Sequence, residues 1–309
     1  MLFYEPEKYL PDPIKILKIW EGGLASHGAA FGILAALWVY SNYDIQFKGI
    51  KPIIHKTHRK NQNFLQVVDR IVIVVALTGC LIRFGTFMNS EIIGKPTHTD
   101  YGVVFAKDMR QFLEHPKSAV ESVEFEQTDA FPASEENYMP MMMELTFRMQ
   151  PQINTEASVK RFTDVNISGY LNDSRYSFYQ HMRAVPPEVQ ESSIQQLNDG
   201  RYVAFVPVYG VSRHPAQLYE SLTSLLLFVL LFLIWSYYKI ELPEGLLLGL
   251  FLVILFGLRF VHELFKENQV AFEDDLTLNM GQILSIPLIL AGIFILFRAL
   301  TRGRVKPEQ

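Results

Sequence analysis

Long apolar runs are the feature that most limits what this chain can fold into. A helix of about 20 apolar residues spans the hydrocarbon core of a bilayer, and five segments of the 309-residue sequence are apolar enough to do so. We expect spans at 24–41, 64–82, 217–238, 246–265 and 281–297. The sequence therefore predicts an all-α polytopic membrane protein with about five transmembrane helices.

The distribution of charge separates this membrane part from a water-exposed part. Only 19% of the chain is charged, but residues 95–212 hold 10 basic and 16 acidic residues, a net charge of −6. An acidic segment is unsuited to nucleic acid and to an anionic leaflet surface. The alternating run MELTFRM predicts one strand and residues 162–171 a second. We therefore expect an inserted, partly β head.

Lysines and arginines in the loops predict the orientation of the spans. The connector 47–60 has five basic residues and no acid, and the tail after Phe297 is also basic. Residues 266–279 have four acids and one lysine. These charges predict a periplasmic head and a cytoplasmic C-terminus. Five spans then leave residues 1–23 outside without an export signal. Either this short segment is translocated unaided or further membrane helices lie upstream of Met1, and we expect the second.

These expectations divide the chain into five parts. They are an interfacial segment at 1–23, a first membrane part at 24–94, the periplasmic head at 95–212, a second membrane part at 213–300 and a cytoplasmic tail at 301–309. The single cysteine, Cys80, excludes an intramolecular disulfide and lies in an apolar run, where a small buried side chain is expected.

Arginines in or beside the apolar runs are the strongest candidates for chemistry, because a charge at the centre of a span costs about 2.5–3.5 kcal/mol. Arg83 ends the second run, and Arg259 lies in the fourth. Arg259 and Glu263 are four residues apart and can pair on one helical face. Two guanidinium groups indicate a phosphate clamp. The alternatives are interfacial snorkelling for Arg83 and a purely structural ion pair for Arg259.

Histidines near two helix starts have both a structural and a chemical interpretation. His27 lies among small residues in GGLASHG, where it either packs or transfers a proton. Arg213, His214, Gln217 and Glu220 lie in SRHPAQLYESL. A helix N-terminus accounts for most of that segment. It does not account for a neighbouring arginine and histidine at the predicted outer level of Arg83.

Five motifs follow one another along the chain: WEGGLASHG, RFGTFMNSEIIGKP, RHPAQLYES, LRFVHELFKE and MGQILSIPLILAG. In this order they resemble the prolipoprotein diacylglyceryl transferases. Enzymes of that family act in the bacterial inner membrane. They move the diacylglyceryl group of phosphatidylglycerol onto the lipobox cysteine of a preprolipoprotein and release glycerol phosphate. The resemblance implies phosphatidylglycerol, lipobox segments and membrane lipids as partners, with no nucleic acid, cofactor or metal.

The resemblance also implies roles for individual residues. Arg83 resembles the family arginine that binds the phospholipid, Arg259 its second essential arginine, and His27 its functionally important histidine. These three are the predicted catalytic residues. The predicted substrate-binding residues are Arg83, Asn89, Glu91, Gly94, Arg213, His214, Gln217, Glu220 and Glu263.

Two alternatives remain open at this point. The family usually has seven spans, and its early helices have no counterpart here, so the short chain is either an active transferase or an inactive one. The rival function from another class is an anionic-lipid-binding or transport protein that lines a path for an anion without cleaving a bond.

Overall fold

A computed structural model of the protein describes residues 26–48, 51–57, 59, 62–99, 101–135, 137–189, 191–267 and 276–302. The chain divides into two compact units. The membrane unit comprises residues up to Ile82, Glu220–Leu264 and residues from Asn268 onward, and the head unit comprises Arg83–Tyr219 with Phe265–Glu267. The predicted division at 95–212 stays a prediction.

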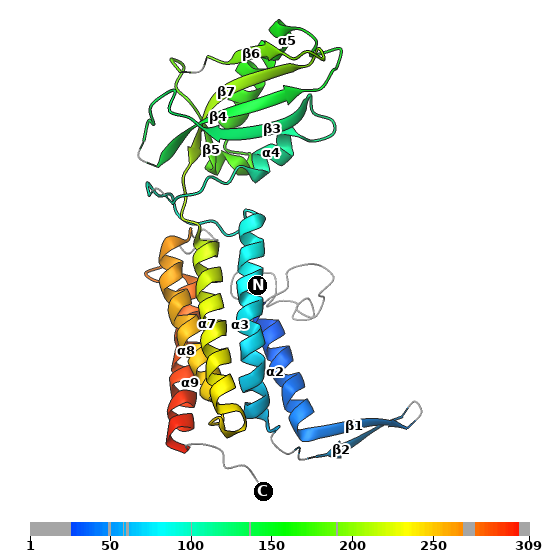
Figure 1. The fold of residues 1–309 in the computed structure, drawn as a ribbon, viewed down its shortest axis with the longest axis vertical. Helices are drawn as coiled ribbons and strands as arrows, with labels where there is room; N and C mark the ends of the chain where they lie inside the picture. The colour runs from blue at the N-terminus through cyan, green and yellow to red at the C-terminus, as the bar shows by residue number, and fades with distance from the viewer. Residues whose placement is uncertain are drawn as a thin grey trace. The chain divides into compact units, whose positions relative to one another are not determined.

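Within the described residues, four helices are long and apolar enough to cross a membrane (Figure 1). They are α3 (Phe64–Met88), α7 (Ala216–Tyr238), α8 (Leu246–His262), which the 3-10 turn η6 (Glu263–Phe265) extends, and α9 (Met280–Arg302). Large apolar side chains such as Phe294 and Leu81 point outward from them, as lipid requires. The prediction of a polytopic membrane protein is confirmed.

The first predicted span coincides with helix α2 (Ser26–Asn42), which has 17 residues and no charged side chain. That length is short of the roughly 20 residues that a bilayer demands. The residues before Ser26 lie outside the described part of the chain. The predicted span at 24–41, like the interfacial segment at 1–23, therefore stays a prediction.

A β-hairpin stands where the sequence predicted only a connector. Strands β1 (Tyr43–Lys48) and β2 (Lys51–Lys56) pair antiparallel, with Ile45 opposite Ile54 and Phe47 opposite Pro52. Tyr43, Ile45 and Phe47 alternate with polar residues, which is the pattern of a strand. The charge count drew attention to the lysines of this segment, and the alternation was missed.

Small residues and one buried carboxylate hold the membrane unit together. A Cβ atom on Gly292 of α9 would lie 2.7 Å from the Cβ of Leu252, and one on Gly249 of α8 would lie 2.9 Å from the Cβ of Leu296. These two glycines therefore allow α8 and α9 to approach closely. Asp69 of α3 is buried and accepts hydrogen bonds from the backbone N–H groups of Gly245 (2.7 Å) and Leu248 (2.8 Å). Asp69 thus caps the N-terminus of α8 from another helix.

The head unit is an antiparallel sheet with helices against one face. Strands β3 (Val120–Gln127), β4 (Tyr138–Phe147), β7 (Tyr202–Val211) and β5 (Met182–Ala184) follow in that order, and β6 (Ser193–Gln196) also pairs with β7. Alternate residues of β4 pack into a core with the helix α4 (Lys107–Leu113). The MELTFRM prediction is confirmed, because Met143–Phe147 lies in β4. The partly β character of the head is confirmed as well.

The second predicted strand, Phe162–Leu171, is wrong. That segment forms the π-helix η3 (Phe162–Ile167) and helix α6 (Ser168–Leu171), continuing α5 (Glu156–Arg161). A capping box starts the run, because Thr155 and Ser158 each bond the backbone N–H of the other. The buried residues recur every four positions, as on a helical face, and they are Val159, Thr163, Ile167 and Leu171. Helical periodicity, not alternation, therefore describes this segment. The short η4 (Ser177–Gln180) precedes β5.

Candidate functional site

Five of the predicted site residues come together in the head unit, around the loop that follows α3. Glu91 and Gly94 belong to this loop, and Arg213, His214 and Gln217 belong to the segment where β7 leads into α7. The Gln217 Nε2 group donates to the Glu91 carbonyl at 2.6 Å, and Arg213 Nη1 donates to the Gly94 carbonyl at 3.0 Å. We call these five residues the loop cluster.

Backbone geometry fixes the loop in place. Gly94 is buried, and a Cβ atom at this position would lie 2.2 Å from the His214 carbonyl oxygen, so only glycine fits. Ser90 and Ile92 have positive φ values of 58° and 54°. Such conformations cost about 1–3 kcal/mol each and persist where the surroundings enforce them, often at functional sites.

Arg213 joins three segments of the head unit. Its side chain is about 5% exposed and donates to Gly94 O (3.0 Å), to Gln180 O (2.8 Å) and to Glu267 Oε1 (2.5 Å). Glu267 and Gln180 were missed by the sequence analysis. Glu267 is the last residue of the motif LRFVHELFKE. Its acidic side chain within that motif was the one sequence feature that could have identified it as a partner of Arg213.

Four buried polar atoms near this cluster have no hydrogen-bond partner among the described residues. They are Ser212 Oγ, Arg213 Nε, Gln217 Oε1 and His181 Nδ1. Buried polar atoms are nearly always paired with protein or with a bound molecule. The loop cluster, with the neighbouring Ser212 and His181, therefore retains donors and acceptors that water or the polar group of a substrate can use.

His214 is held in a partly buried aromatic setting. Its Nδ1 lies 3.2 Å from the Tyr219 hydroxyl, and its ring lies 5.3 Å from that of Phe265 and 6.3 Å from that of Tyr101. Burial, followed by the nearby His98, lowers the pKa of His214 below its usual value. His214 is therefore neutral at physiological pH and acts as a hydrogen-bonding group rather than as a cation.

Arg83 and Asn89 lie at the end of α3 and just beyond it. The hydroxyl of Thr86 donates to the Arg83 carbonyl at 2.8 Å. Asn89 accepts a hydrogen bond through Oδ1 from Lys107 at 3.0 Å, at the start of α4. The end of the helix is thereby tied to the head unit.

The predicted pair of Arg259 and Glu263 is confirmed in the membrane unit. Arg259 Nε lies 3.7 Å from Glu263 Oε1. Asn279 donates to the carboxylate of Glu263 at 3.4 Å, and a Cβ atom on Gly281 would lie 2.5 Å from its Cδ. Glu263 is thus held between the end of α8 and the start of α9. The partly exposed Arg259 keeps the remaining donors of its guanidinium for another acceptor.

The other predicted residues are not joined into one site. Arg83 belongs to the head unit, and Arg259 and Glu220 to the membrane unit, so the two-arginine clamp stays a prediction. His27 lies in α2, but its side chain is outside the described part of the structure.

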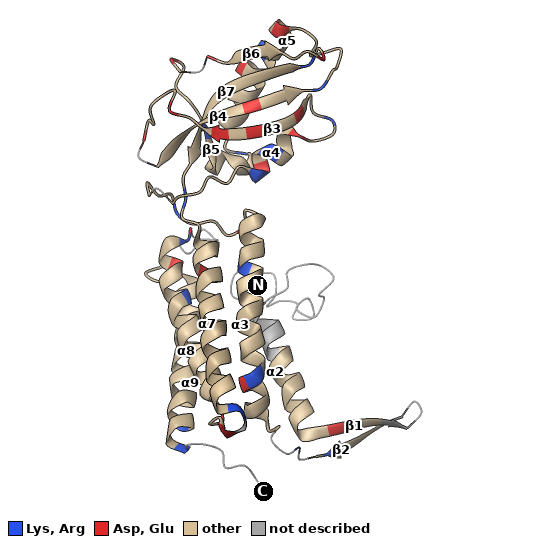
Figure 2. Cartoon of the chain, viewed as in Figure 1, with Lys and Arg blue, Asp and Glu red and all other residues tan. Residues whose placement is uncertain are grey.

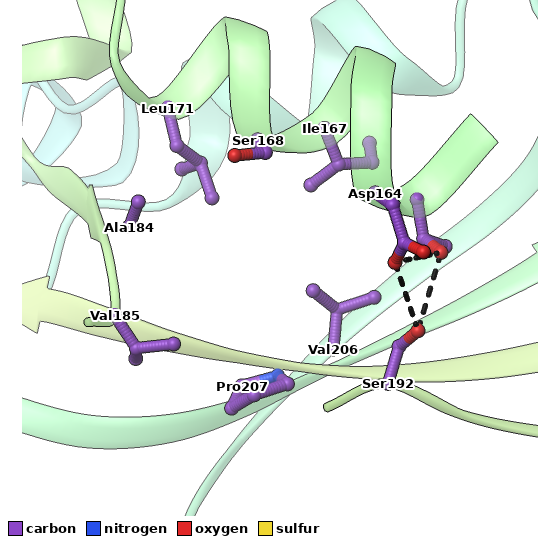
Figure 3. A pocket seen from close by; sticks show the side chains of 10 residues that line it. Asp164, Ile167, Ser168, Leu171, Ala184, Val185, Ser192, Val206 and Pro207 are labelled. Atoms are coloured by element: carbon purple, nitrogen blue, oxygen red, sulfur yellow. Dashed lines mark hydrogen bonds between the residues drawn. The ribbon is translucent and has the colours of Figure 1, made fainter. Parts of the chain in front are cut away.

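A small cavity in the head unit can be set aside as a ligand site. Figure 3 shows it between η3, α6 and the strands, with Asp164 and Ser192 close together. Ser192 Oγ lies 3.3 Å from Thr163 Oγ1 and 3.5 Å from Asp164 Oδ1. The volume of this cavity is about 10 Å³, which is room for one water molecule.

The described residues contain no group of three or more His, Cys, Asp or Glu side chains that could hold a metal ion. Cys80 is buried, and its Sγ lies 3.3 Å from the Ser221 hydroxyl. The prediction for this cysteine, a small buried side chain, is confirmed.

Comparison with known proteins gives a consistent result. A sequence model of the family described as prolipoprotein diacylglyceryl transferase matches residues 1–298. A phosphatidylglycerol–prolipoprotein diacylglyceryl transferase of Tolumonas auensis is 32% identical over 295 residues, covering 96% of this chain and 69% of the relative. Proteins of the same name from Chloroherpeton thalassium (27% identical, 98% and 70% covered) and Porphyromonas gingivalis (29% identical, 97% and 70% covered) are also similar.

Proposed function

The chain belongs to the prolipoprotein diacylglyceryl transferase family, and we propose that it transfers the diacylglyceryl group of phosphatidylglycerol to the cysteine thiol of a prolipoprotein. The observation that carries this proposal is the match of the family across residues 1–298. Each motif that resembled the family falls inside that range. The loop cluster supports the proposal, because it gathers two of these motifs around unpaired buried polar atoms.

The proposed reaction is a substitution at carbon. The substrate thiol loses its proton and its sulfur attacks the glycerol carbon that bears the phosphate. The carbon–oxygen bond breaks, and glycerol phosphate leaves with the bonding electron pair. A thioether between the lipobox cysteine and diacylglycerol is formed. The phosphate diester is already a leaving group, so the residues need to bind it, stabilise its charge and remove one proton.

Arg83 and Arg259 are proposed to bind the phosphate and to stabilise the charge that develops on it. The support comes from their residue type and from the motifs they occupy. The contact with Glu263 supports Arg259 in addition, because this carboxylate orients the guanidinium through one nitrogen and leaves the others available. His27 is proposed as the proton acceptor, since imidazole titrates near neutral pH.

The remaining site residues are proposed to bind or orient the substrates. Asn89, Glu91, Gly94, His214, Gln217 and Glu220 would contact the headgroup or the lipobox segment. Arg213 is proposed to act by positioning rather than by direct binding, because Gly94, Gln180 and Glu267 already occupy its buried guanidinium.

The proposed setting is the inner membrane of a bacterium, with the head in the periplasm. Support comes from the loops: five basic residues at 47–60 and a basic C-terminal end favour the cytoplasm, and the acidic segment 266–279 favours the outside. Figure 2 shows how sparse charge is along the helices of the membrane unit. Preprolipoprotein lipobox segments and membrane lipids are the proposed partners.

The direct test is reconstitution of the chain in liposomes of phosphatidylglycerol and phosphatidylcholine with a synthetic lipobox peptide. Mass spectrometry should find the peptide with diacylglycerol attached through the cysteine. A peptide with serine in place of that cysteine is the matched control and should stay unmodified. Binding of phosphatidylglycerol without any adduct would instead favour the lipid-binding or transport function.

A further inference from the structure

The β-hairpin of the membrane unit is a two-stranded ribbon that the transferase reaction does not use. Strands β1 and β2 pair with each other, and no third strand joins them among the described residues. A two-stranded hairpin is marginally stable by itself in water. The ribbon therefore calls for a further surface against which it can rest.

The register makes the ribbon two-faced. Residues directly opposite each other in an antiparallel pair share a side. One side carries the pairs Tyr43–Lys56, Ile45–Ile54 and Phe47–Pro52, and the other side carries Asp44–His55, Gln46–Ile53 and Lys48–Lys51. The first side is apolar apart from one lysine. Ile54, at its centre, is 62% exposed.

The ribbon leaves the membrane unit at the ends of its helices. Figure 1 shows it extending sideways from the end of α2, beside the start of α3. Spans run across a bilayer, so an element that extends sideways from their ends runs along its surface. This placement gives the apolar side of the ribbon a bilayer to face.

Aromatic side chains and one arginine anchor the base of the ribbon. Arg59 donates to the Tyr40 carbonyl at 2.6 Å and to Asp44 at 3.2 Å, and its guanidinium carbon lies 4.4 Å from the centre of the Tyr40 ring. Trp38 and Tyr43 meet edge to face at 5.7 Å. Tryptophan and tyrosine with arginine are typical of the membrane–water boundary.

The charge of the ribbon identifies the lipid that suits it. The ribbon has three lysines, at positions 48, 51 and 56, against one acid, Asp44, so its net charge is +2, and two further basic residues follow it at positions 59 and 60. Each lysine near an anionic leaflet adds about 1 kcal/mol to binding, which is about fivefold in the bound-to-unbound ratio. We propose that the ribbon of Tyr43–Lys56 is a membrane-surface element that rests with its Ile54 side on an anionic leaflet.

The proposal goes beyond the transferase activity and holds or fails independently of it. A soluble protein or a second copy of the chain could in principle cover the same apolar side. The cationic surface and its position at the ends of the spans favour the leaflet, and the experiment separates the three.

Adjacent positions on opposite sides of the ribbon provide a matched pair of probes. The full chain with Cys80→Ser, carrying either Ile54→Cys or Ile53→Cys, is labelled with an environment-sensitive fluorophore. It is then reconstituted in phosphatidylcholine vesicles with or without phosphatidylglycerol. Nitroxide-bearing lipids should quench the label at position 54 strongly and the label at position 53 weakly. Added phosphatidylglycerol should increase the quenching at position 54.

A charge variant then tests the role of the lysines. Lys56→Gln, on the Ile54 side of the ribbon, should lower the bound-to-unbound ratio of the ribbon by about fivefold in phosphatidylglycerol vesicles at low salt. The same variant should change nothing in pure phosphatidylcholine.

Three outcomes would overturn the proposal. Equal quenching of both labels by aqueous iodide would show that the ribbon extends into water. Shielding of position 54 that disappears when the protein is diluted in the bilayer would identify a second copy. Shielding that requires an added soluble protein would identify that protein as the occupant. None of these outcomes bears on adduct formation, so the proposed transferase function is tested separately.

Discussion

The membrane unit and the head unit place apolar and charged residues in opposite ways. On the membrane unit, large apolar side chains such as Leu81, Leu226 and Phe294 are among the most exposed residues. The head unit keeps Met143, Leu145 and Phe147 inside. Its charged side chains, apart from the buried Arg213 and Lys266, are at least partly exposed among the described residues. The difference teaches that a polar side chain buried in either unit needs its own explanation. Asp69 has one as a helix cap, and Arg213 as a link between segments.

Breaking the buried link of the head unit should have the largest effect. Arg213→Ala removes the charge that pairs with Glu267 and leaves two backbone carbonyls without a donor, which should cost about 3 kcal/mol or more. Hydrogen exchange of the β5 and β7 amides in the full chain would measure this loss. Arg175→Ala is the control, because this exposed arginine pairs with Asp173 at the surface. Equal exchange in the two variants would contradict the linking role.

The two arginines of the proposed phosphate clamp, Arg259 in the membrane unit and Arg83 in the head unit, should respond in activity, whereas Arg213 responds in stability. Arg259→Lys keeps the charge and the pairing with Glu263 but loses the planar fork of donors, and Arg83→Lys does the same at the end of α3. Loss of one donor to developing charge lowers turnover by about 100-fold or more. The rate of adduct formation in liposomes is the measurement, with Arg298→Lys as the control. Full turnover in both variants would exclude the phosphate clamp.

Removal of the buried helix cap should destabilise the membrane unit without changing any of the proposed catalytic or substrate-binding residues. Asp69→Ala leaves the N–H groups of Gly245 and Leu248 unpaired, at a cost of about 2 kcal/mol. The midpoint of unfolding in sodium dodecyl sulfate should fall accordingly. Asp69→Asn keeps one acceptor oxygen and should lose less. A variant with an unchanged midpoint would show that the cap contributes nothing.

The smallest expected effect is a pH dependence confined to the head unit. Burial, followed by the charge of Arg213, lowers the pKa of His181 to about 4, whereas an unfolded histidine has a pKa of about 6.5. The unfolded head therefore binds a proton first, and stability falls as the pH drops below about 6.5, by about 1 kcal/mol at pH 5.5. Hydrogen exchange of the β5 amides, measured between pH 7.5 and pH 5.5, would follow this loss of stability.

Two histidine variants separate this cause from general acid sensitivity. His181→Phe keeps a ring beside Phe105 and should abolish the slope between pH 6.5 and 5.5. Replacement of the exposed His115 by asparagine should leave the slope as it was. An unchanged slope in His181→Phe would assign the pH dependence to other groups.

Hydropathy and helical spacing predicted what depends on residues close in sequence. A run of about 20 apolar residues suffices to find α3, α7, α8 and α9, and spacing of four suffices to pair Arg259 with Glu263. The contacts of Arg213 could not be predicted, since Gln180 and Glu267 lie 33 and 54 positions away. Their meeting depends on the tertiary fold.

Two secondary-structure predictions were wrong because each segment was assessed for the wrong sequence pattern. Phe162–Leu171 was assessed for alternation, although its buried residues recur every four positions. Residues 47–60 were assessed for charge, and the alternation that forms the ribbon was overlooked. The loop cluster was predicted as a set of motif positions, but the fit of Gly94 against the His214 carbonyl depends on two segments that only the fold brings together.

The three residues Phe265–Glu267 set an order for the biosynthesis of the head. Lys95 N donates to the Phe265 carbonyl at 2.8 Å, and Glu267 receives the guanidinium of Arg213. The chain from Arg83 to Tyr219 is synthesised before α7 is finished and before α8 begins. The head therefore reaches its final contacts only after the ribosome has completed both helices. A translating chain released before residue 267 would carry a head with its buried arginine still unmatched.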